Sequence, residues 1–71
     1  IYYRSPIFDF SNSLLQNAIF RGINLQAANF SHANLQGTDF EGADPSYANF
    51  DGANLQGAIF KNTDLIGADL R

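Results

Sequence analysis

Large apolar residues recur at every fifth position along most of this chain. Between residues 28 and 60, a small residue, usually Ala, lies two positions before each large one, and Asn or Asp usually lies between them. The large residues of this stretch are Phe30, Leu35, Phe40, Phe50, Leu55 and Phe60. The same register extends from Phe10 to Leu70, and only at Pro45 is the large residue neither Leu nor Phe. The chain is therefore a tandem repeat of five residues.

A period of five excludes both regular secondary structures. On a helix, a five-residue step rotates the apolar position by roughly 140°, so no buried stripe would form. On a continuous strand, successive large residues would fall on opposite faces. The pattern instead predicts a short extended step followed by a turn. The small and the large residue point inward, the Asn or Asp between them points outward, and the last two residues form the corner.

The second corner position holds all the glycines of the chain, which supports this assignment. Glycine adopts the positive φ angles that tight corners need without steric cost. The glycines at this position are Gly22, Gly37, Gly42, Gly52, Gly57 and Gly67.

The large residues alternate between Phe and Leu, which supports a coil with four faces, since an odd number of faces would mix the two residue types. With four faces, residues twenty apart stack, and opposite faces carry the same residue type. The predicted columns are Phe10/Phe30/Phe50/Leu70, Leu15/Leu35/Leu55, Phe20/Phe40/Phe60 and Leu25/Pro45/Leu65.

The motif Ala-(Asp/Asn)-(Leu/Phe)-x-x in tandem resembles the pentapeptide-repeat family. That resemblance implies an all-β fold, a right-handed quadrilateral parallel β-helix with four pentapeptides per coil. Residues 8–71 would form about three and a half coils of this solenoid. Residues 1–7 depart from the motif and are expected to form an N-terminal cap.

Composition limits the possible partners. The chain has 71 residues and no Cys. Its net charge is −3 and it has no cluster of basic residues, which argues against binding of nucleic acid. No apolar run approaches the roughly 18 residues that a membrane span needs, so no membrane insertion is expected. The chain begins with Ile and contains no Met, which indicates a processed product or an incomplete chain.

No residue set predicts catalysis, a metal site or a cofactor. Ser31, His32 and Asp51 nominally form a Ser/His/Asp set, but outward side chains on one face diverge into solvent. The Asp residues are spread over three faces and do not converge on a metal. We expect the Asp and Asn side chains to bond nearby backbone N–H groups instead.

The irregularities of the repeat are the candidate partner contacts. Arg21, Glu41 and Lys61 are expected to form an outward ladder of alternating charge. Leu70 lies at a C-terminal end without a polar cap, where the chain would continue, meet a partner or stack on a second copy. The candidate contacts are Tyr2 and Tyr3, Ile19 and Ile59 on either side of Asp39, Pro45 with Tyr47, and Leu70.

Every strong feature of the sequence serves the solenoid, so we predict a non-enzymatic structural or protein-interaction module. An accessory subunit of a larger assembly is one such role. The resemblance implies a soluble cyanobacterial or plastid protein, in the cytoplasm or the thylakoid lumen. It also suggests an alternative, a DNA mimic that inhibits or protects DNA gyrase, a type II topoisomerase. Ice binding is disfavoured because Thr38 and Thr63 occupy inward positions.

Overall fold

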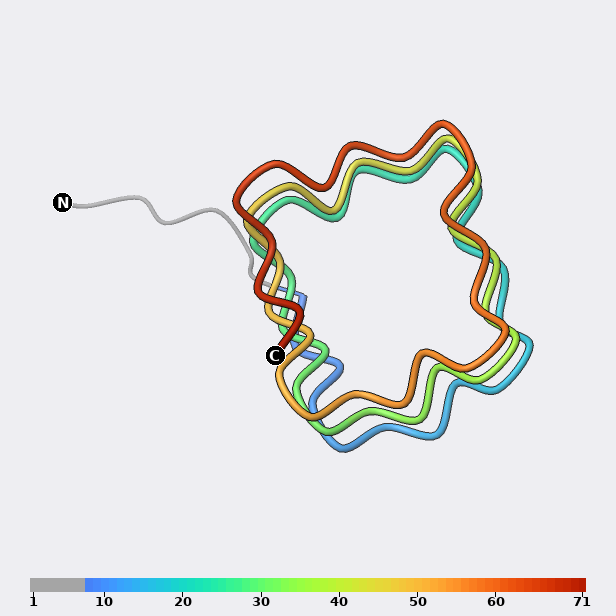
Figure 1. Cartoon of the computed structure of the whole chain (residues 1–71), viewed down its shortest axis with the longest axis vertical. Helices are drawn as coiled ribbons and strands as arrows, with labels where there is room; N and C mark the ends of the chain where they lie inside the picture. The colour runs from blue at the N-terminus through green and yellow to red at the C-terminus, as the bar shows by residue number, and fades with distance from the viewer. Residues whose placement is uncertain (1–7) are drawn as a thin grey trace, which may run out of the picture.

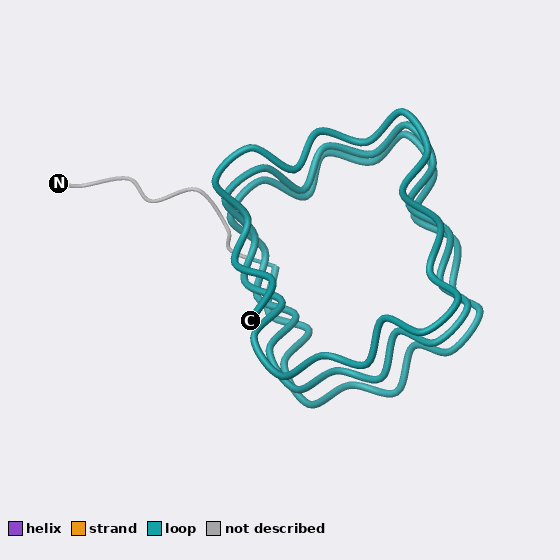
Figure 2. Cartoon of the chain, viewed as in Figure 1, coloured by secondary structure: helices purple, strands orange, loops and turns teal. Residues whose placement is uncertain are grey.

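The computed structural model describes residues 8–71, which form a stack of four-sided coils (Figure 1). The predicted cap, residues 1–7, lies outside the described residues. Within residues 8–71 there is no helix and no strand longer than a single bridge, so the coil is drawn throughout as loop and turn (Figure 2). Parallel bridges join outward residues twenty apart, such as Asn34 to Asn54. The predicted solenoid and its register of twenty residues are confirmed, although the paired segments are too short to form continuous strands.

Backbone hydrogen bonds hold the coils together. With one bond to a side chain, they pair every N–H group of a regular repeat. In the repeat centred on Leu35, the N–H groups of Leu35 and Gly37 donate to the following coil, and that of Asn34 donates to the preceding coil, all at 2.9 Å. The Thr38 N–H donates to the Leu35 carbonyl at 3.0 Å and closes the corner. The Gln36 N–H donates to Oδ1 of Asn34 at 3.1 Å. Each repeat thus meets the requirement that backbone polar groups be paired.

The second residue of each corner has a positive φ angle, whether or not it is glycine. The glycines have φ between 69° and 72°, as the third position of a type II turn requires. Six other residues adopt the same conformation, with φ from 54° to 61°. They are Asn12, Asn17, Ala27, His32, Tyr47 and Asn62.

Two stacked columns of phenylalanine form the centre of the core. Phe30 and Phe50 are parallel within 2°, with ring centroids 5.1 Å apart, and Phe40 and Phe60 are 5.0 Å apart. The two columns meet edge to face, since Phe30 and Phe40 cross at 88° with centroids 5.6 Å apart. Both geometries suit the quadrupole of the aromatic ring. The predicted inward columns are therefore confirmed, and burial is most complete in the middle coil, between Leu25 and Phe50.

Pro45 interrupts the ladder on one face. It has no N–H to donate, and Asp44 and Asp64 are the one pair of outward residues twenty apart within residues 8–71 that forms no bridge. The Pro45 ring itself is fully buried, in the column between Leu25 and Leu65. The third coil is therefore joined less tightly to the second on this face than on the other three.

Replacement of Phe40 by Ala is expected to lower the free energy of unfolding by about 3–5 kcal/mol, because its buried ring contacts both phenylalanine columns. His32→Ala should change it by no more than about 0.5 kcal/mol, since His32 is exposed. Chemical denaturation of the protein and of the two variants measures both changes in the free energy of unfolding. Equal effects of the two substitutions would contradict the inward and outward assignment.

Gly52→Ala is expected to destabilise the protein more than Gly22→Ala. Both glycines have φ +69°, so the backbone strain of about 1–2 kcal/mol is shared. A Cβ on Gly52 would lie 2.5 Å from His32 Nδ1, whereas a Cβ on Gly22 has no neighbour within 4 Å. The exposed His32 ring must turn away from such a Cβ, so the excess cost at Gly52, about 0.5–1.5 kcal/mol, should disappear when His32→Ala is added. An excess that persists in the double variant would show that the His32 ring is not its cause.

Candidate protein-interaction surface

Large apolar side chains are exposed at several places on an otherwise polar surface. Three of them, Leu14, Ile19 and Ile59, take the outward position that Asn or Asp holds in the other repeats. The full set among residues 8–71 is Phe8, Leu14, Ile19, Ile23, Tyr47, Ile59, Ile66 and Leu70. Four of these residues were not among the predicted contacts, namely Phe8, Leu14, Ile23 and Ile66. The sequence signal for Leu14 was present, because a large residue there breaks the Asn/Asp pattern.

Two of these side chains lie on one face, which we call the isoleucine face. It comprises the outward residues of the repeats centred on Phe20, Phe40 and Phe60, namely Ile19, Arg21, Asp39, Glu41, Ile59 and Lys61. Ile19 and Ile59 are bridged to Asp39 from either side and are 70% and 44% exposed. The predicted arrangement of two isoleucines around Asp39 is confirmed.

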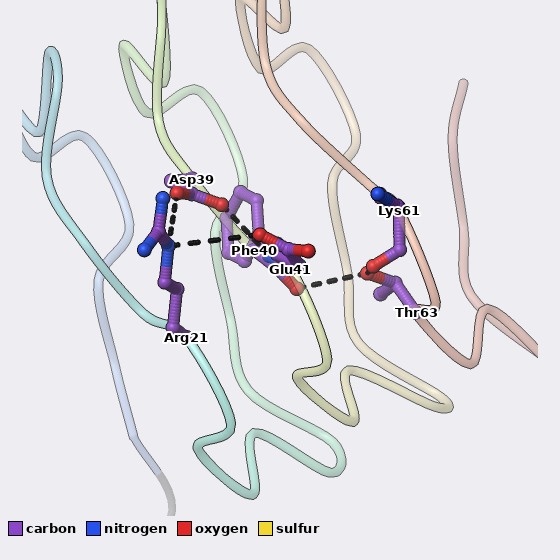
Figure 3. A network of polar contacts seen from close by, with 6 residues as sticks. All are labelled: Arg21, Asp39, Phe40, Glu41, Lys61 and Thr63. Carbon is purple, nitrogen blue, oxygen red and sulfur yellow. Dashed lines mark hydrogen bonds and ion pairs between the residues drawn. The ribbon is translucent and has the colours of Figure 1, made fainter.

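Asp39 is the centre of a polar network on the isoleucine face (Figure 3). Its Oδ2 accepts a bond from Nε of Arg21 at 2.5 Å, and its Oδ1 accepts the Glu41 backbone N–H at 2.9 Å. The bond from the Glu41 N–H and the Arg21 guanidinium hold the pKa of Asp39 below its usual value. Asp39 is only 7% exposed, so its charge is compensated inside the network rather than presented to a partner.

The predicted charge ladder of Arg21, Glu41 and Lys61 is corrected by the structure. Arg21 pairs first with Asp39, and its Nε lies 3.8 Å from Glu41 Oε2. Among residues 8–71, Lys61 forms no ion pair. The reason is that Asp39 offers Arg21 a shorter contact through both charge and hydrogen bonding. Lys61 is therefore a free cation within the described part of the chain.

Tyr47 forms a second exposed apolar cluster with its neighbour Ile66, and both are 66% exposed. The Tyr47 N–H donates to the Ile66 carbonyl at 2.9 Å, and the Tyr47 ring covers the place where Gly67 would carry a Cβ. The prediction that Pro45 contacts a partner beside Tyr47 is wrong, because Pro45 takes the inward position of its repeat and its ring is buried.

The remaining candidates lie at the two ends. Leu70 is 53% exposed in the last coil, and the inward residues Phe60 and Leu65 of that coil are partly buried. Tyr2 and Tyr3 lie outside the described residues.

Ser31, His32 and Asp51 make no side-chain hydrogen bonds to one another in the described region. The His32 ring instead lies above the corner of the next coil at Gly52. Across residues 8–71 there is no pocket and no group of three His, Cys, Asp or Glu residues placed to hold a metal ion. The same residues contain no helix with the length and apolarity of a membrane span.

Comparisons with known proteins agree with this geometry. The family model of pentapeptide repeats matches residues 9–44 and 46–71, in eight copies. Among solved structures, the chain is similar to the crystal structure of a pentapeptide repeat protein (Rfr23) from the cyanobacterium Cyanothece 51142, with a TM-score of 0.85 and 36% identity. The aligned region covers 89% of this chain and 44% of that one, so this chain spans less than half of its neighbour's length. A search of curated proteins returned no significant match. The chain belongs to the pentapeptide-repeat family.

Proposed function

We propose that this protein is a non-catalytic protein-interaction module, an accessory subunit that presents the faces of its solenoid to a larger assembly. The observation that carries the proposal is the exposure of large apolar side chains on a surface without pockets across residues 8–71. A flat surface with apolar side chains suits a protein partner better than a small molecule. The cyanobacterial neighbour supports a cyanobacterial or plastid setting.

The finer description of the scaffold belongs to this proposal. A register of twenty residues over residues 8–71 supports a little over three coils, close to the predicted three and a half. The right hand of the coil follows from the family resemblance. Such a stack would hold its outward side chains at fixed spacings, because each coil is hydrogen-bonded to the next.

We place the partner contacts on the isoleucine face and at Tyr47 with Ile66, where large apolar side chains are exposed. The exposed Leu70 adds a third surface, through which a second copy could stack on the last coil.

Photo-crosslinking from these side chains tests the proposal. A benzoylphenylalanine placed at Ile19 or at Tyr47 is expected to crosslink a protein partner in the cells that produce the chain, because both side chains are exposed. The matched control is the same group at Gln36, an exposed polar residue of the face centred on Leu35. The measurement is the yield of crosslinked species, identified by mass spectrometry.

A yield at Ile19 and Tyr47 no higher than at Gln36 would overturn the proposal. Crosslinks to a second copy of this chain alone would rule out the accessory role and support self-association as the use of these surfaces.

The acidic balance of the chain supports a second candidate, the DNA mimic of gyrase that the resemblance suggests. We expect no effect of this kind, because Asp39 and Asp69 are paired with Arg21 and Arg71 and form no continuous acidic row. The measurement is gyrase supercoiling with and without a quinolone, at micromolar protein. Protection or inhibition at that concentration would favour the DNA mimic over the interaction module.

A further inference from the structure

Most repeats place a side-chain oxygen on one particular backbone N–H group, that of the first corner residue. The oxygen is Oδ1 of the Asn or Asp two positions earlier, at 2.8–3.2 Å. These bonds are Asx turns, in which the side chain satisfies a donor that faces away from the core. They occur in ten repeats, whose acceptors are Asp9, Asn24, Asn29, Asn34, Asp39, Asp44, Asn49, Asn54, Asp64 and Asp69.

Three repeats break the rule, because their outward residue is Leu14, Ile19 or Ile59 and offers no oxygen. The corresponding N–H groups, those of Gln16, Arg21 and Lys61, have no acceptor within residues 8–71. In the ten regular repeats this N–H points at an outward side chain, so in these three it points out of the coil. All three residues are exposed.

Two of the three unfilled donors lie on the isoleucine face, and there each belongs to a cationic residue, Arg21 or Lys61. Beside each stands an exposed isoleucine, Ile19 or Ile59. The Arg21 guanidinium is already bound by Asp39 at 2.5 Å, whereas Lys61 has no ion pair in the described region. The Lys61 repeat therefore combines a free backbone donor, a free cation and an aliphatic side chain at one place.

We propose that the isoleucine face binds a protein segment through an Asp or Glu carboxylate that fills the missing acceptor position at Lys61, with an aliphatic neighbour packed on Ile59. The carboxylate would accept the Lys61 N–H, as Oδ1 of Asn34 accepts the Gln36 N–H elsewhere in the coil, and would also pair with the ammonium group. The Arg21 repeat supplies a second, weaker position, since its guanidinium is engaged by Asp39.

The charges of the face favour a different protein over a second copy of this chain. Asp39 and Glu41 lie between Arg21 and Lys61, and an antiparallel copy would set these carboxylates against their own counterparts. They would also repel the closely spaced phosphates of a nucleic acid. A single carboxylate at Lys61 brings only one negative charge to this face, and of the two carboxylates there Asp39 is buried and already paired with Arg21.

This inference rests on the proposed interaction function and names the chemistry of one partner. It is tested by titrating the 15N-labelled protein with the blocked peptide acetyl-Leu-Asp-Leu-amide and following the backbone amide shifts. We expect saturable shifts that are largest at Lys61 and smaller at Arg21. The peptide with Asn in place of Asp should bind at least about tenfold more weakly, because it keeps the acceptor and loses the charge.

Ile59→Asn is the informative variant, because it restores the side-chain oxygen that ten repeats already have and so conforms to the fold. It should abolish the Lys61 shift. Ile66→Asn is the matched control, since Ile66 is 66% exposed and its N–H is already bound by Asp64 Oδ1 at 3.0 Å. That variant should bind the peptide as the parent protein does.

The inference is overturned if the Asp and Asn peptides bind equally, if no saturable shift occurs at Lys61, or if Ile59→Asn leaves the shift unchanged. Stronger shifts of the same amides with a short DNA duplex would assign the face to nucleic acid and would also overturn it. Failure of the peptide while Ile19 or Tyr47 still crosslinks a partner would leave the interaction function standing and remove only this assignment of chemistry.

Discussion

The stack depends on one constraint, the pairing of the backbone N–H groups of each regular repeat in a coil that has no continuous strands within residues 8–71. In a regular repeat, three N–H groups bond to neighbouring coils, one closes the corner and one binds the outward Asn or Asp, as seen around Leu35. The five-residue motif supplies a partner for each of these five N–H groups. A chain with longer strands could tolerate irregular corners, but here each corner residue has a fixed task.

The core follows from the same geometry. Because the coils repeat every twenty residues, each Phe lies directly over another, as with Phe30 and Phe50 at 5.1 Å. Small residues such as Ala28 and Ala48 leave room for the rings. Where a threonine takes the small position, as at Thr38, its hydroxyl donates to the Leu15 carbonyl at 2.8 Å and is satisfied inside the core. The core thus tolerates a polar residue only with a local acceptor.

Our proposals rest on the departures from the regular repeat that this constraint permits. An apolar residue at the outward position leaves the coil intact and frees one N–H group, as Ile59 does at Lys61. A proline at the inward position is buried and removes one donor between coils, as Pro45 does next to Asp44 and Asp64, which form no bridge. The first kind of departure alters the surface, and the second alters the cohesion of the stack. Only the first changes the surface on which we propose that a partner binds.

Periodicity determined the inward positions and the corners, because a repeat of five leaves few ways to bury a large residue in every unit. The twenty-residue register came from the resemblance to the pentapeptide-repeat family, and the alternation of Phe and Leu agrees with it. The register also located Ile19 and Ile59 beside Asp39. It could not decide how charges pair across coils, since Arg21 reaches either Asp39 or Glu41 and only distances choose between them. Nor could it show that the Tyr47 ring covers Gly67. Those outcomes depend on side-chain packing between coils, which the tertiary structure alone decides.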